Sequence, residues 1–505
     1  MVESSLPVVT ILLPIAGSFV VFGLGFTRAR GAREWLALAF AVASLGLALS
    51  CALQVWQGNR LSSLNMALYV GGLSALMLVL VDGMVVLILI QSIRYMRKEL
   101  AGGMTTEARL TLYYALILLF TGTMNWTVTT NNMVMLYVAM EGTTLATALL
   151  VAFYRTRASL EAGYKYVLLV VVGITFSLFG IILIYAAAVP HLPSGRSALM
   201  LTEVGRIANV IPKNIALLAV AFMTCGFATK AGLVPFHAWL PDAHAEAPSP
   251  ISALLSGLII KVGAYALART VTIFAPHYHA VVVFIAILTS ASMVIGIVMA
   301  LVQDDLKRLL AYSSVSQISY VFEGLGLGTY LGIYGGLFHL VNHTIIKALL
   351  FMSVSAIMYA TGGRRKISEL GGLASKMPIT AVAFFIGALA IGGLPPFNGF
   401  MSKFTIFLAV GEAKLYWAMG IGIFTGLLTI ACLVWAAYRV FWRQPAVEVV
   451  TANPGGPVRE VPFLMWLSIA ILAIACVVIG IYPQILHTPL DAATRAILRI
   501  WAGGY

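Results

Sequence analysis

Apolar stretches of membrane-spanning length follow one another along the whole chain. A helix needs about 20 residues to cross the hydrocarbon core of a bilayer, and about fourteen such stretches can be counted. Hydrophobic residues make up 61% of the chain and charged residues only 10%, whereas soluble domains carry about 25% charged residues. The connections are mostly short. These features predict an all-α, polytopic membrane protein with no soluble domain.

The formal net charge of +13 could suggest a nucleic-acid partner, but the distribution of lysine and arginine indicates membrane topology instead. Loops after even-numbered predicted helices hold roughly a third as many basic residues as loops after odd-numbered ones. By the positive-inside rule the odd loops are cytoplasmic, so we expect both termini on the outer side of a prokaryotic-type cytoplasmic membrane. The expected surroundings are therefore a lipid bilayer, with no nucleic acid.

The cysteines show no spacing typical of an iron–sulfur or zinc site, since Cys51, Cys225, Cys432 and Cys476 are widely separated. We therefore expect no metal, no bound cofactor and no catalytic redox centre in this chain. The cysteines are interpreted as small buried apolar residues.

Five charged residues lie inside apolar stretches: Glu141, Lys230, Lys261, Lys347 and Lys403. A charge at membrane depth costs about 2.5–3.5 kcal/mol on insertion scales and is found mainly where it faces a polar interior and serves transport. These residues therefore predict translocation of protons or other ions.

Two apolar segments are interrupted by prolines close to an intramembrane lysine, at 229–257 and 392–404. Interrupted helices at matching places in two halves favour an inverted repeat with a transport path near the midplane, while ordinary proline kinks are the alternative. The expected division is 1–109 for flanking helices 1–3, 110–275 for a first repeat of helices 4–8, 276–445 for a second repeat of helices 9–13, and 446–505 for helix 14 and the tail.

The spacing of the charged residues suggests a proton relay. A lone carboxylate in lipid would become neutral, and Lys230 from another helix is the expected ion-pair partner of Glu141. Moving the carboxylate away would then make the lysine release its proton, so the pair could act as a switch. A static structural ion pair is the alternative.

His339, His343 and Lys347 follow at i, i+4 and i+8, which share one helical face. Two histidines four apart could bind a metal or simply pack, but a third ligand is missing and a proton wire is favoured. Lys261 is interpreted as an interior relay, and Lys403, after the second interruption, as the exit group. Candidate accessory residues are Asp82, His237, Asp242, His244 and Asp305.

Four motifs resemble one membrane-protein family: segment 229–257, DDLKRLLAYSSVSQISY at 304–320, FHLVNHTIIKALLF at 338–351 and GGLPPFNGFMSKF at 392–404. The chain resembles the antiporter-like proton-translocating subunits shared by respiratory complex I, membrane-bound hydrogenases and Mrp-type cation/proton antiporters. The resemblance implies 14 transmembrane helices, with two inverted five-helix repeats and broken helices 7 and 12. It also implies that Glu141 and Lys230 form the coupling pair, that Lys261 is the central lysine, and that His339, His343 and Lys347 continue the hydrophilic axis to Lys403.

The leading hypothesis is therefore a non-redox, proton-translocating subunit of a redox-driven membrane complex. Expected partners are other membrane subunits, including further antiporter-like ones, and peripheral redox subunits with iron–sulfur clusters and a nickel–iron or quinone site. The first alternative is a Mrp-type Na⁺/H⁺ secondary antiporter subunit. A proton-driven inorganic-carbon uptake subunit is a weaker alternative, and a non-pumping membrane scaffold is a third.

Overall fold

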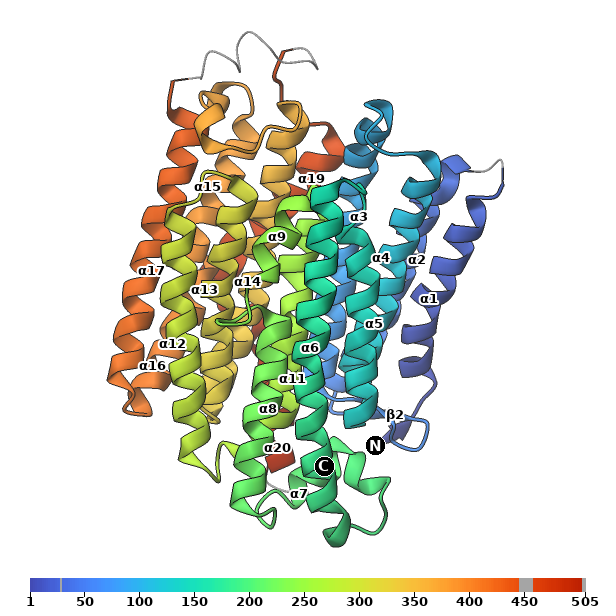
Figure 1. Cartoon of the computed structure of the whole chain (residues 1–505), viewed down its shortest axis with the longest axis vertical. Coiled ribbons are helices and arrows are strands. Elements are labelled where there is room, and N and C mark those ends of the chain that lie inside the picture. Colours follow the sequence, from blue (N-terminus) through green and yellow to red (C-terminus); the bar gives the residue numbers. More distant parts are fainter. Residues whose placement is uncertain (28–29, 445–456, 502–505) are drawn as a thin grey trace.

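The protein is a bundle of long helices that stand side by side (Figure 1). The computed structural model describes residues 1–27, 30–444 and 457–501. Within this part, eleven helices are long and apolar enough to cross a membrane, so the prediction of an all-α, polytopic membrane protein is confirmed. Two further long helices fall outside this group because threonine, serine, asparagine and glutamine interrupt their apolar residues, namely α4 (Glu107–Thr129) and α13 (Leu306–Gly326).

The other long helices are α1 (Leu6–Leu24), α2 (Arg33–Trp56), α3 (Gly72–Ala101), α5 (Met133–Val151), α6 (Arg157–Ala188), α8 (Lys213–Ala231), α12 (His279–Leu301), α14 (Tyr330–Ala360), α17 (Tyr416–Ala437) and α19 (Phe463–Ile481). The shorter helices are α7 (Leu201–Arg206), α9 (Trp239–Glu246), α10 (Ser249–Leu254), α11 (Ile260–Thr270), α15 (Pro378–Gly392), α16 (Asn398–Glu412) and α20 (His487–Trp501). Three short strands, β1 (Val2–Glu3), β2 (Leu61–Ser63) and β3 (Leu68–Val70), form one small sheet in that order.

The centre of the bundle is formed by α14 and by the segment that contains α10 and α11. All residues of the apolar window in Ser249–Phe274 are buried inside the protein, and 94% of those in α14 are, against 33% in α2. A helix that is buried all round faces no lipid, so it can carry polar residues provided that neighbouring helices supply hydrogen-bond partners. The buried lysines and histidines lie on or beside these central helices.

Two helices end inside the bundle at glycines with left-handed backbone geometry. Gly232 ends α8 with φ 74°, and Gly393 ends α15 with φ 90°. In both places the amide of the following leucine donates to the carbonyl oxygen five residues earlier, at 2.9 and 3.2 Å. This arrangement is the Schellman motif, which glycine permits because it has no Cβ. Prolines follow in both loops, so each interruption is set by local sequence.

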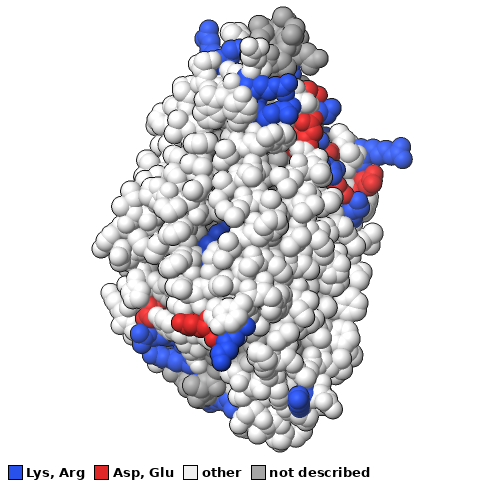
Figure 2. Space-filling view, turned by 90° about the vertical axis from the view of Figure 1, so that its left-hand side faces the viewer, with Lys and Arg blue, Asp and Glu red and all other residues white. Residues whose placement is uncertain are grey.

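The first residues of the chain, the small sheet, α7 and the last described helix, α20, lie at the same end of the molecule (Figure 1). On the face shown in Figure 2, charged residues gather towards the two ends, and the broad band between them is uncharged except for one basic group visible in its middle. This distribution fits a protein whose middle lies in lipid. The expected position of both termini on the outer side stays a prediction. The expected boundary at residue 446 lies within 445–456, outside the described residues.

Candidate functional site

All four intramembrane lysines are buried: the exposed fraction is 0% for Lys230, Lys261 and Lys347 and 3% for Lys403. A buried ammonium group is costly unless it is hydrogen-bonded, and each of these lysines has at least two acceptors within reach. The acceptors come from neighbouring helices, which makes each lysine a junction between helices.

Lys230 lies in the last turn of α8, two residues before the terminating glycine. Its Nζ donates to Thr144 Oγ1 at 2.7 Å and to the Met140 carbonyl oxygen at 3.4 Å, both on α5. The predicted direct ion pair with Glu141 is wrong: although both residues lie in the described part of the chain, no ion pair joins them, and Glu141 Oε1 has no hydrogen-bond partner. The reason is helix geometry. Residues 140 and 144 share the face of α5 that meets Lys230, while residue 141 is turned by about 100° from residue 140.

Lys261 occupies the centre of the protein, in the first turn of α11. Its Nζ lies 2.7 Å from His343 Nδ1 on α14 and donates to the Ser256 carbonyl oxygen at 2.5 Å. Ser256 belongs to a π-helical turn, Leu255–Ile259, which links α10 to α11. Such turns break the regular i→i−4 hydrogen-bond ladder and are frequent at functional sites. Here the turn provides a carbonyl group for the lysine.

One face of α14 carries the two histidines and Lys347. The ring centroids of His339 and His343 are 6.0 Å apart, and His339 Nδ1 lies 3.0 Å from Ser402 Oγ on α16. Lys347 Nζ turns to α13, where it donates to Ser313 Oγ at 2.6 Å and to a backbone carbonyl at 3.0 Å. Within the described residues, no group of three or more His, Cys, Asp or Glu residues could hold a metal ion. The histidine pair therefore lacks the further ligands that a metal site would need.

Lys403 lies on α16 and closes the second interruption. Its Nζ donates to the carbonyl oxygens of Ile391 and Gly392, at 2.8 and 3.3 Å, which are freed where α15 ends. It also lies 4.7 Å from the ring centroid of Tyr320. The Tyr320 ring is in turn 5.6 Å from that of His339. Buried polar groups thus follow one another from Lys261 through the histidines to Lys403, although no hydrogen bond between described residues joins His343 to His339.

The link from Lys230 to Lys261 is made by packing alone. Their helices approach so closely that a Cβ at Gly263 of α11 would lie 2.4 Å from the Phe227 carbonyl oxygen of α8. In the described part of the chain no hydrogen bond joins the two lysines. A proton passing between them needs a water molecule or a side-chain movement.

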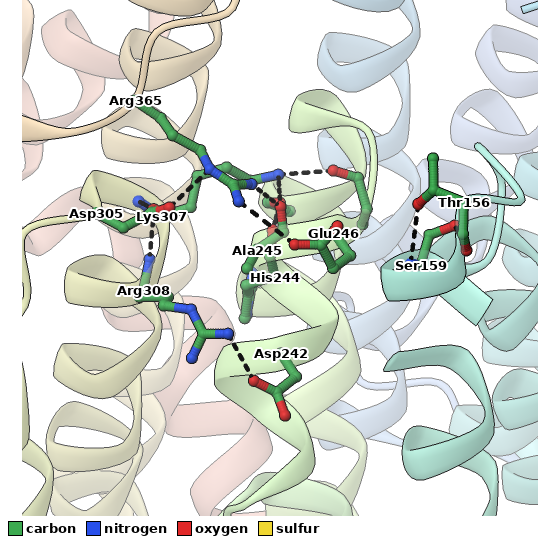
Figure 3. Close-up of polar contacts among 12 residues, drawn as sticks. Thr156, Ser159, Asp242, His244, Ala245, Glu246, Asp305, Lys307, Arg308 and Arg365 are labelled. Carbon is green, nitrogen blue, oxygen red and sulfur yellow. Dashed lines mark hydrogen bonds and ion pairs between the residues drawn. The ribbon is translucent and has the colours of Figure 1, made fainter. Parts of the chain in front are cut away.

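A network of ion pairs joins α9 to the start of α13 and to the loop after α14 (Figure 3). Asp242 on α9 binds Arg308 at 2.9 Å and Lys165 at 2.6 Å. Arg365 binds Asp305 at 2.7 Å and Glu246 at 3.3 Å. The structure therefore brings the accessory candidates Asp242 and Asp305 together at the end predicted to be cytoplasmic. Their side chains are partly exposed, as expected for a solvated mouth.

The other accessory candidates lie in three different environments. His244 is fully buried, stacks on Phe351 with ring centroids 4.7 Å apart, and neither of its ring nitrogens has a partner among the described residues. His237 is half-buried in the loop after the first interruption, and its ring centroid lies 6.3 Å from that of Tyr312. Asp82 is buried on α3, away from the lysines, and accepts a long hydrogen bond from Asn125 Nδ2 at 3.4 Å.

Sequence reasoning missed several polar partners of the lysines, chiefly Thr144, Ser313 and Tyr320, because hydroxyl groups are common in membrane helices and carry no distinctive signal. It also missed Glu323, which is only 2% exposed on α13. The rule that singled out Glu141, a carboxylate in an apolar run, would have found Glu323 too.

Comparison with known proteins supports the family resemblance of the sequence motifs. Residues 130–429 match the family described as "NADH:quinone oxidoreductase/Mrp antiporter, TM", and residues 56–101 match "NADH-Ubiquinone oxidoreductase (complex I), chain 5 N-terminus". The first match contains every predicted relay residue, from Glu141 to Lys403.

Individual relatives come from several branches. The chain is 34% identical over 356 residues to a hydrogenase-4 component F homolog of Methylacidiphilum infernorum, covering 70% of this chain and 74% of that protein. It is 32% identical over 463 residues to a Na⁺/H⁺ antiporter subunit of Alkalihalophilus pseudofirmus, covering 86% of this chain but 55% of that longer protein. A chain in the structure of an archaeal membrane-bound sulfane sulfur reductase superposes with a TM-score of 0.87 and 25% identity, covering 99% of this chain and all of that one. The protein belongs to the antiporter-like membrane subunit family shared by respiratory complex I, membrane-bound hydrogenases and Mrp-type antiporters.

Proposed function

We propose that the protein is the proton-translocating, antiporter-like subunit of a redox-driven, multi-subunit membrane complex. The observation that carries this proposal is the row of buried titratable groups from Lys261 through His343 and His339 to Lys403. Such groups are costly at membrane depth and serve mainly as transport paths. Family membership supports the same function.

The contact between Lys261 and His343 can transfer a proton. In a hydrogen bond between these two nitrogens, one nitrogen must donate and the other accept. When the ammonium of Lys261 donates to Nδ1, the imidazole is neutral; transfer of the proton leaves a neutral amine and an imidazolium. Both states keep the hydrogen bond between the two nitrogens, so a proton can pass from Lys261 to His343. The other ring nitrogen of His343, Nε2, has no partner among the described residues, so onward transfer to His339 needs a water molecule.

For the whole chain we propose fourteen transmembrane helices, with inverted repeats at 110–275 and 276–445 flanked by 1–109 and 446–505. The matching interruptions after Gly232 and Gly393 support this division, since each is a glycine-terminated helix followed by prolines beside a buried lysine. The segment α8–α11 would contain broken helix 7, and the segment α15–α16 would contain broken helix 12, each together with its neighbours. Backbone carbonyls freed at such interruptions can line a hydrated path.

Protons would enter from the cytoplasm through the network around Asp242 and Asp305, which has partly exposed carboxylates at its surface. They would reach Lys261 and leave on the outer side, where both termini would lie, in a prokaryotic cytoplasmic membrane. Glu141 and Lys230 would couple this path to the neighbouring subunit. Electron transfer in peripheral partner subunits, with iron–sulfur clusters and a nickel–iron or quinone site, would supply the energy. This chain would hold no redox cofactor.

The test replaces Lys230 by alanine in the complete complex and measures proton uptake into inverted membrane vesicles. Lys230→Ala should abolish coupled pumping while the complex still assembles, because the path loses the cation that would couple it to the neighbouring subunit. Lys213→Ala is the matched control, since Lys213 is an exposed lysine at the other end of the same helix. Unchanged pumping in Lys230→Ala would refute the relay.

A Mrp-type Na⁺/H⁺ antiporter subunit is the second candidate, because the match to the Na⁺/H⁺ antiporter protein of Alkalihalophilus pseudofirmus covers 86% of this chain. Purification through a tag on this chain, followed by mass spectrometry, separates the two. Co-purified iron–sulfur subunits would support the redox-driven pump. Small membrane partners alone, together with Na⁺-dependent proton movement without an electron donor, would support the antiporter.

A further inference from the structure

The row of buried groups ends at Lys403, yet the structure holds one more titratable group beyond it. Glu323 lies three residues before the end of α13, on the side of Lys403 away from the ion-pair network at the other end of that helix. Its exposed fraction is 2%, and no described residue donates a hydrogen bond to its Oε1. It also makes no ion pair with any described residue. A buried carboxyl in this state must take up a proton or meet water.

Glu323 is joined to the end of the row by Tyr320. The two residues are three positions apart on α13, so their side chains are neighbours on the helix surface. The Tyr320 ring lies 4.7 Å from Lys403 Nζ and 5.6 Å from the His339 ring. Glu323 is therefore about one helical turn, or roughly 4.5 Å along the axis, beyond the level of Tyr320.

Tyr320 itself is fixed in place and does not offer its hydroxyl to the lysine. The hydroxyl donates to the Gly422 carbonyl oxygen at 2.7 Å and lies 2.9 Å from Thr425 Oγ1, both on α17. Lys403 meets the face of the Tyr320 ring, which cannot accept a proton. A proton leaving Lys403 thus needs another acceptor, and Glu323 is the only carboxyl in the sequence of α13.

We propose that Glu323 is the release group of the pathway: it accepts the proton that leaves Lys403 and passes it to the outer aqueous phase. This proposal rests on the proposed function. The proton is transferred through water: the ammonium of Lys403 becomes an amine and the carboxylate of Glu323 becomes a carboxylic acid. The charged pair and the neutral pair have the same net charge, so the transfer moves no net charge out of the site. Glu323 then loses the proton outward, and Lys403 regains one from the His339 side.

The experiment uses the whole complex in sealed inverted vesicles and follows a single turnover with pH indicators on both sides of the membrane. Glu323→Gln removes the titratable oxygen while keeping the shape. It should leave proton uptake from the cytoplasmic side in place and slow release on the other side by about a hundredfold, the lower end of what a positioned acid–base group contributes. Glu323→Asp should restore most of the release rate. A merely structural role would impair uptake and release together.

Glu412→Gln is the matched control, because Glu412 is an exposed carboxyl at the end of α16; this variant should behave like the unmodified complex. If Glu323→Gln fails to assemble, Glu323→Leu supplies an apolar side chain suited to the buried position, and it should show the same delayed release. Normal release in either variant, while Lys230→Ala still blocks pumping, would overturn the role of Glu323 and leave the proposed function standing. Normal pumping in Lys230→Ala as well would overturn both.

Discussion

Lys261 Nζ lies 2.7 Å from His343 Nδ1, and this contact joins α11 to α14 at the centre of the protein. The two residues come from stretches that the sequence places in different halves of the chain. Each is fully buried, and the histidine also leads to His339, whose ring centroid is 6.0 Å away. The contact therefore joins the buried polar groups of the first half to those of the second.

Replacement of His343 should separate the hydrogen bond from proton transfer. His343→Gln keeps a side chain that can accept from Lys261 but cannot titrate, so the complex should assemble and proton pumping should be lost. His343→Ala should also destabilise the protein by about 1–3 kcal/mol, the usual cost of leaving a buried donor unpaired. Vesicle pumping and thermal unfolding in detergent, measured on both variants, check these results. Full pumping in His343→Gln would contradict the relay.

Thr144 should matter as the nearest acceptor for Lys230, at 2.7 Å. Thr144→Ala removes this acceptor and should cost about 1–3 kcal/mol, with reduced pumping because the lysine is no longer held against α5. Thr144→Ser keeps the hydroxyl group and should retain most of the stability and most of the pumping. Thermal unfolding and vesicle pumping of the two variants test this prediction. Equal stability and equal pumping in both variants would show that Lys230 does not depend on the Thr144 hydroxyl.

The fold could be predicted in outline because the length of each apolar stretch can be read from the sequence. The lysines were recognised for the same reason, since each lies inside an apolar stretch. Contacts between helices were harder to predict from the sequence. The ion pair of Glu141 with Lys230 was wrong because a difference of one residue along α5 turns a side chain by about 100°, which only the packed structure decides. Glu323 was overlooked although its burial follows the same rule as that of Glu141.

Gly399 should be intolerant of any side chain. A Cβ at this position would lie 1.8 Å from the Ala390 carbonyl oxygen, where backbone atoms cannot yield. Gly399→Ala should therefore destabilise the protein by about 1–3 kcal/mol or more and lower the yield of assembled complex. Gly420→Ala is the control, because a Cβ there meets nothing within 4 Å. Thermal unfolding of the two variants should differ accordingly.

The C-terminal helix α20 should detach more easily in acid. Burial alone would raise the pKa of Asp491, but a hydrogen bond from Tyr330 and contacts with Arg495 lower it below the usual value. A lowered folded-state pKa means that the stabilisation is present above the unfolded pKa of about 3.9 and is lost as pH falls through and below that value. The hydrogen-exchange protection factors of 487–499 should therefore fall in acid, and Asp491→Asn should remove this dependence on pH.

The enclosure of α14 has a consequence for biogenesis. Its carbonyl groups accept from Gln91 at 2.9 Å and from Lys98, both on α3, while its first residue, Tyr330, binds Asp491 of α20 at 2.7 Å. Helix α14 is thus held both by a helix made early in synthesis and by a helix made last. A nascent chain that still lacks α20 lacks the contact between Tyr330 and Asp491, so α14 reaches its full set of contacts only after the last described helix has been made.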